Sequence, residues 1–86
     1  MSEMKRLCVQ MSPGDNVVIA VQEISAGTQV FEDVVTTEAI PQGHKIAVKD
    51  IEKGGEIVRY GVVLGYAINK IYKGNWINEK MLTLPV

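Results

Sequence analysis

The feature that most restricts the fold of this chain is a ten-residue pattern that occurs three times. Each copy has an isoleucine three positions before a glycine, with an apolar residue three positions outside each of them. The copies span residues 21–30, 48–57 and 68–77. Glycine adopts positive φ angles that a side chain opposes, so each copy predicts a corner where one strand ends, the isoleucine turns under the chain and a new strand begins. We expect a short 3-10 turn at each of these Ile-x-x-Gly corners.

The spacing of the copies indicates a compact domain rather than a solenoid. The copies begin at residues 21, 48 and 68, whereas solenoid repeats keep a constant period. The chain has 86 residues, the length of one domain, and we treat residues 1–86 as one unit. Valine and isoleucine are abundant, glycine or proline interrupts the chain at short intervals, and no window has a sustained helical period. The sequence therefore predicts an all-β fold.

Strands are expected wherever apolar residues alternate or run together between turn-forming residues. The segment 12–16 is a turn, because its proline fixes φ and its glycine and asparagine tolerate positive values. A bend near Glu32 makes a hairpin of the third expected strand. The expected strands cover residues 7–11, 17–21, 29–36, 45–48, 56–60, 62–67 and 76–84.

The charge and cysteine content exclude several classes of function. Nine basic residues are balanced by ten acidic ones, so the chain lacks the basic excess of a nucleic-acid-binding domain. No apolar run approaches the roughly 18 residues that a membrane helix needs, and the N-terminus has no signal-peptide pattern. The single cysteine, Cys8, leaves no partner for an internal disulfide and suits a reducing compartment. We expect a cytoplasmic protein that binds neither nucleic acid nor membranes.

Three blocks of the sequence resemble one known family in their order and spacing. Residues 15–21, 40–54 and 57–67 resemble the SAF domain of altronate and galactarate dehydratases, and the similarity extends over about 15–76. The resemblance implies a β-clip fold, a small and strongly bent sheet. It also implies the N-terminal domain or small subunit of an enzyme that removes water from a sugar acid together with a large subunit and a divalent metal, Fe²⁺ or Mn²⁺. The small subunit of sulfolactate sulfo-lyase, which eliminates sulfite, is similar.

His44 is the candidate catalytic residue and metal ligand. It is the only histidine, and it follows a Pro-x-Gly turn in the most characteristic of the three blocks. An imidazole transfers protons near neutral pH and binds borderline metals. Its position alone favours an ordinary loop histidine, and the resemblance reverses this preference in favour of the functional interpretation. A catalytic metal site needs about three protein ligands, so a partner chain must supply the others.

Three further residues are candidates for substrate binding: Arg59, Lys45 and Asn16. Sugar acids carry carboxylates, which a guanidinium binds through two parallel hydrogen bonds. The simpler interpretations are a solvated strand position for the two cations and a turn-forming role for Asn16. One departure weakens the metal assignment: the family pattern His-x-His-Asn after the last corner is missing, and Asn78 and Lys80 stand in the places of the two histidines.

Two functions of different classes follow. The first is the small subunit of an altronate/galactarate-type dehydratase, which contributes to metal-assisted β-elimination of water with a large catalytic subunit. The second is a non-catalytic sugar-acid-binding or assembly module, or the small subunit of a sulfolactate sulfo-lyase. We expect no activity from the chain alone. Exposed strand edges make a homodimer a further expectation.

Overall fold

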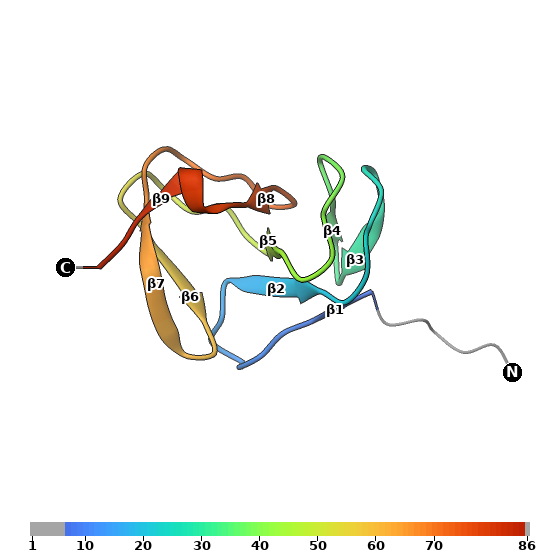
Figure 1. Ribbon diagram of the computed structural model, residues 1–86, viewed down its shortest axis with the longest axis horizontal. Coiled ribbons are helices and arrows are strands. Elements are labelled where there is room, and N and C mark those ends of the chain that lie inside the picture. Colours follow the sequence, from blue (N-terminus) through green and yellow to red (C-terminus); the bar gives the residue numbers. More distant parts are fainter. Residues whose placement is uncertain (1–6, 86) are drawn as a thin grey trace, which may run out of the picture.

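The computed structural model describes residues 7–85, which form nine short strands and one 3-10 helix (Figure 1). The prediction of an all-β fold is confirmed, and each expected strand region contains at least one strand. No helix in the described part of the chain is long and apolar enough to cross a lipid bilayer. The elements are β1 (Cys8–Val9), β2 (Val17–Ala20), β3 (Gln29–Phe31), β4 (Val34–Val35), β5 (Lys45–Ala47), β6 (Glu56–Arg59), β7 (Val62–Ala67), β8 (Trp76–Ile77), η1 (Glu79–Met81) and β9 (Leu82–Thr83).

Two local expectations differ from the structure. The segment 76–84 is not continuously extended, because η1 interrupts it where the Asn78 side chain accepts a hydrogen bond from the Lys80 N–H at 2.9 Å. Such side-chain bonds to nearby backbone compete with strand pairing. The 3-10 turns expected at the corners are not confirmed. Two of the three predicted corners contain a single i+3 to i backbone bond, from Gly55 to Glu52 and from Asn75 to Tyr72, within ordinary turns.

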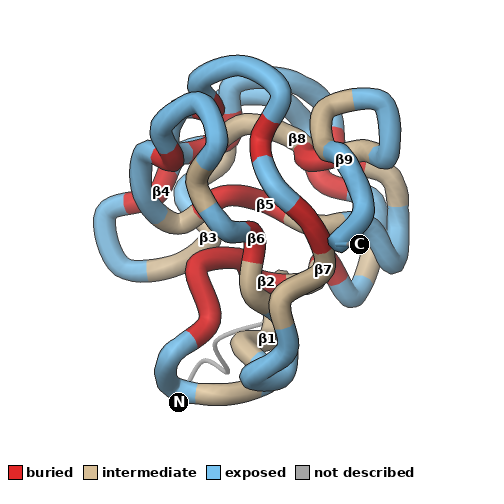
Figure 2. The backbone as a smooth tube through the Cα atoms, turned by 90° about the vertical axis from the view of Figure 1, so that its left-hand side faces the viewer, coloured by how far each residue is buried: buried red, intermediate tan, exposed pale blue. Residues whose placement is uncertain are grey.

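The strands form three antiparallel sheets around one central layer. The central sheet has the order β1-β2-β5-β8, the second sheet has the order β6-β7-β9, and β3 and β4 form a separate hairpin. In Figure 1 the β3–β4 hairpin and the β6–β7 ribbon lie at opposite ends of the molecule, with β2 and β5 between them. Figure 2 shows buried residues along these two central strands and exposed residues along most of the connecting loops.

The central sheet separates two apolar clusters, because successive side chains of a strand point to opposite faces. Val18 and Ile46 are paired across β2 and β5 and belong to one cluster, while Val17 and Ala47 are paired and belong to the other. The first cluster contains Cys8, Val18, Ala20, Ile24, Val34, Ile40 and Ile46. The second contains Val17, Ala47, Ile51, Ile57, Ala67, Ile71 and Ile77.

The structure contains four corners of the predicted kind, one more than the three copies of the sequence pattern predict. The fourth is built on Ile40 and Gly43. The four isoleucines are paired: Ile24 and Ile40 exchange two backbone hydrogen bonds of 2.9 and 2.8 Å, and Ile51 and Ile71 exchange two of 2.7 and 2.8 Å. All four isoleucines are buried. Each pair therefore closes the base of a hairpin, β3–β4 in the first case and β6–β7 in the second.

The corner glycines add a second set of contacts that relates the two halves of the chain. Each has positive φ, between 80° and 93°. Each N–H also donates to the carbonyl four residues before the isoleucine of the partner corner, over 2.8–2.9 Å. These bonds run from Gly27 to Thr36, from Gly43 to Ala20, from Gly54 to Ala67 and from Gly74 to Ala47. The domain thus consists of two equivalent units, each a corner, a hairpin and a second corner.

The surroundings of two corner glycines predict that the same substitution has different costs. A Cβ at Gly43 meets no described atom within 4 Å, so Gly43→Ala should cost only the strain of positive φ, about 1–2 kcal/mol. A Cβ at Gly74 collides with the backbone carbonyl oxygen of Val35, which should add about 1–3 kcal/mol of overpacking. Urea unfolding followed by Trp76 fluorescence measures both losses. Equal losses would contradict the close approach of the backbones at Gly74.

Candidate functional site

Asn16 joins the central sheet to the second sheet. Its amide NH₂ donates to the Glu56 carbonyl and its amide oxygen accepts the Val58 N–H, both at 2.8 Å. The side chain therefore acts as a short piece of strand beside β6, where the pairing of β6 with β7 shifts register between Ile57 and Val58. Asn16 is buried. The structure thus uses the side-chain amide of this predicted substrate-binding residue in backbone bonds.

Asp15 holds the tip of the β6–β7 hairpin. Its carboxylate accepts the N–H groups of Tyr60 at 2.7 Å, Gly61 at 2.9 Å and Ser12 at 3.1 Å. Burial alone would raise the pKa of Asp15, but these three donors, with a contribution from the Arg59 charge, bring the pKa below its ordinary value. Asp15 therefore stays ionised and fixes the turn that Tyr60 enters at a φ of 57°.

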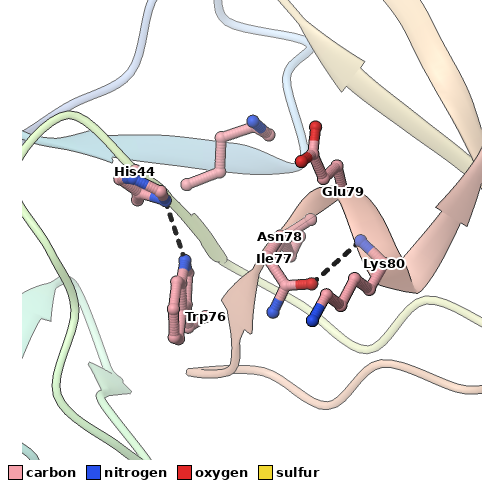
Figure 3. Close-up of a pocket in the computed structure, with 7 residues that line it drawn as sticks. His44, Trp76, Ile77, Asn78, Glu79 and Lys80 are labelled. Carbon is pink, nitrogen blue, oxygen red and sulfur yellow. Dashed lines mark hydrogen bonds between the residues drawn. The ribbon is translucent and has the colours of Figure 1, made fainter.

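His44 and Trp76 meet at the edge of the central sheet. His44 immediately precedes β5, and Trp76 begins the neighbouring strand β8. The indole Nε1–H donates to His44 Nδ1 over 3.0 Å, and the two rings pack edge to face with their centroids 5.5 Å apart (Figure 3). An indole N–H can only donate, so Nδ1 must be the acceptor. In the neutral imidazole the proton is then on Nε2.

A pocket of about 560 Å³ opens beside this pair. In Figure 3 the chain runs from Trp76 through Asn78 into η1, which carries Glu79 and Lys80 along one wall. The Asn78 amide oxygen is used to cap η1. The lining residues are His44, Lys45, Trp76, Ile77, Asn78, Glu79 and Lys80.

Lys45 supplies a partly desolvated cation to the pocket. Burial lowers the pKa of Lys45, the charge of Arg59 lowers it further, and Glu79 opposes both effects. Arg59 therefore lies within electrostatic range of Lys45, although it does not line the pocket. The structure brings together three predicted site residues, His44, Lys45 and, at a greater distance, Arg59.

The remaining pocket residues were not candidates for the site from the sequence. Glu79 and Trp76 carry no motif that marks them as functional, because their role depends on the pairing of β5 with β8 across 30 residues of chain. Asn78 and Lys80 had one signal: they stand where the resembled family has histidines. The structure shows that both line the same pocket as His44.

Comparison with known proteins assigns this domain to a family. The family model described as the altronate/galactarate dehydratase SAF domain matches residues 6–85. The chain belongs to this family. Galactarate dehydratase (L-threo-forming) of Escherichia coli strain K12 is 46% identical to this SAF domain over 79 residues, which is 90% of this chain.

Two altronate dehydratases show the same relationship. The protein of Escherichia coli strain K12 is 38% identical over 63 residues, and that of Bacillus subtilis strain 168 is 33% identical over 73 residues, covering 70% and 81% of this chain. The SAF domain spans only 13–15% of the length of these three relatives.

The described residues of this SAF domain do not fit a resident metal ion. No group of three or more His, Cys, Asp or Glu side chains in residues 7–85 is placed to hold one. The pocket offers one imidazole and one carboxylate, from His44 and Glu79. The bond from Trp76 occupies one imidazole nitrogen, and the other carries the proton. A metal ligand needs a free nitrogen lone pair, so His44 cannot bind a metal while this bond is present.

The bonding of Asp15 predicts a stability change with a matched control. Asp15→Asn replaces one of the two acceptor oxygens with an NH₂ group that faces N–H donors, and should lower the free energy of unfolding by about 2–3 kcal/mol at neutral pH. Asp33→Asn, in an exposed carboxylate that accepts from Lys73 Nζ, should leave it unchanged within error. Urea unfolding measures both.

The same bonds set the pH dependence of this effect. Because the pKa of Asp15 is lower in the folded state, its stabilising contribution is complete above its unfolded-state pKa and is lost as the pH falls through its folded-state pKa. Wild type and Asp15→Asn should therefore converge in stability in strong acid. A constant difference at all pH values would contradict the assigned ionisation.

The His44–Trp76 bond predicts the tautomer of the imidazole. Long-range ¹H–¹⁵N NMR spectra of the neutral side chain should show a protonated Nε2 and an unprotonated, hydrogen-bonded Nδ1. Trp76→Phe removes the donor and should shift the Nδ1 resonance toward that of a free ring nitrogen. A protonated Nδ1 in the wild type would contradict the geometry.

Proposed function

We propose that this chain is the SAF part of a sugar-acid dehydratase of the altronate/galactarate type, working with a large catalytic subunit. Family membership over residues 6–85 supports the enzyme class. In each relative the matched region is only 13–15% of the length, so most of each relative lies outside it.

The observation that carries the proposal is the pocket that His44 lines together with Lys45 and Lys80. Ammonium groups attract the carboxylates of a sugar acid. The bond from Trp76 to Nδ1 leaves the Nε2–H of His44 as a hydrogen-bond donor. Together these groups can hold a carboxylate of a sugar acid while water is eliminated from its carbon chain.

The proposed reaction assigns the binding of a substrate carboxylate to this chain. A base of the large subunit removes the proton α to the carboxylate, and the C–O bond at the neighbouring carbon breaks. An acid of the large subunit gives a proton to the departing hydroxyl, which leaves as water, while His44 Nε2–H donates a hydrogen bond to the carboxylate. The resulting enol becomes the 2-keto-3-deoxy acid. The Fe²⁺ or Mn²⁺ shared with a partner stays a prediction of the resemblance, and no step assigned to this chain depends on it.

One observation favours the second candidate, a non-catalytic sugar-acid-binding or assembly module. Asn78 and Lys80 replace the histidines of the family pattern, and the described residues hold no metal-ligand cluster. In this case the pocket binds a sugar acid without taking part in its elimination. The sulfo-lyase role, the cytoplasmic location and a homodimer stay predictions from the sequence.

A reconstituted enzyme tests the proposal. His44→Ala, mixed with the large dehydratase subunit of the same organism, should lower kcat/KM on galactarate or altronate by roughly 10-fold or more, the cost of a charge-assisted hydrogen bond. Lys49→Ala, an exposed lysine outside the pocket, is the control and should keep wild-type turnover. Wild-type turnover with His44→Ala would favour the non-catalytic module.

A further inference from the structure

We propose that the pocket of this chain is a metal-independent carboxylate site, in which Lys45, Lys80 and the Nε2–H of His44 hold one carboxylate of the ligand. This inference deepens the proposed function and rests on it for the identity of the acid. It differs from the role that the family resemblance implies, because His44 becomes a hydrogen-bond donor to an anion instead of a metal ligand.

The hydrogen bond from Trp76 determines the tautomer of His44. Trp76 donates to Nδ1 over 3.0 Å, and this leaves Nε2 with the proton. A metal ion needs a nitrogen without a proton, whereas a carboxylate oxygen needs a donor. The His44–Trp76 pair therefore selects an anion over a cation.

The pocket is lined by more positive than negative side chains. Lys45 and Lys80 line it and form no ion pair within 4.0 Å among the described residues; the lysines that do form ion pairs, Lys70 and Lys73, bond elsewhere to exposed acids. Glu79 is the one acidic residue of the lining. With Arg59 acting on Lys45 from outside the pocket, positive charge exceeds negative charge there.

The partial burial of Lys45 strengthens its interaction with a bound carboxylate. Lys45 is half-buried in β5, and a carboxylate that enters the pocket compensates its partly desolvated ammonium group. Interactions in a partly desolvated pocket are stronger than those on an open surface. Lys45 should therefore contribute more to binding than an exposed lysine with the same charge.

The pocket lies between the two equivalent units, where β5 pairs with β8. The residues that leave corner Gly43 are His44 and Lys45, and those that leave corner Gly74 are Asn75 and Trp76. The pairing of β5 with β8 brings these two exits together. The two exits carry different side chains, so imidazole, ammonium and indole meet only at this junction of the fold.

A titration of the isolated full chain tests the proposal. Galactarate, a dicarboxylate, is added at constant ionic strength with EDTA present, and binding is followed by ¹H–¹⁵N NMR and by Trp76 fluorescence. We expect saturable shifts of the His44 and Trp76 side-chain resonances. Galactitol, which has the same carbon chain without carboxylates, should give none.

Three variants locate the site. Lys45→Gln should weaken galactarate binding about 10-fold or more, the cost of a charge-assisted hydrogen bond, and Lys80→Gln, at an exposed position, should weaken it less. Lys49→Gln, at an exposed position outside the pocket, should bind like the wild type. Equal weakening in all three would show non-specific attraction and overturn the proposal.

The remaining outcomes separate this inference from the proposed function. Binding of galactarate only when Mn²⁺ is added, or no saturable shift at all, overturns the metal-independent site. Turnover of the reconstituted enzyme is a separate measurement, so an active enzyme with a negative titration would refute the inference and leave the proposed function in place.

Discussion

The backbone exchange between paired isoleucines is the interaction on which the rest of this structure depends. Ile24 with Ile40, and Ile51 with Ile71, close the bases of two hairpins while their side chains fill the two apolar clusters. The same corners direct β5 and β8 out of the two units as neighbours. The pocket lies along that pair of strands, so its geometry is a consequence of how the corners pair.

The sequence predicted what depends on local chemistry. Strand positions followed from apolar runs and turn residues, and three of the four corners followed from the spacing of isoleucine and glycine. At the fourth corner, Ile40, the sequence indicates only a turn, because no residue marks it as the partner of Ile24. Three other features join residues about 16 to 42 positions apart in the sequence. They are the pairing of corners, the bond from Trp76 to His44 and the hydrogen bonds by which the Asn16 side chain takes the place of a strand. Periodicity carries no information about such contacts.

The pocket combines a family fold with its own set of side chains. The SAF match covers every described residue, and the corners that build the pocket are intact. An amide and an ammonium group, from Asn78 and Lys80, line the pocket where the sequence resemblance implies histidines. His44 has the same position whether it is interpreted as a metal ligand or as a hydrogen-bond donor to a carboxylate. Its bond to Trp76 and its cationic neighbours determine which ligand it suits.

The central claim is that Lys45 and Lys80 receive a ligand carboxylate in the working enzyme. Lysine acetylation measured by mass spectrometry, on the chain assembled with its large subunit, tests it directly. The account predicts that galactarate slows acetylation of Lys45 and Lys80 and leaves the exposed Lys49 and Lys53 unchanged. Acetylation of Lys45 and Lys80 at the same rate with and without galactarate would contradict it.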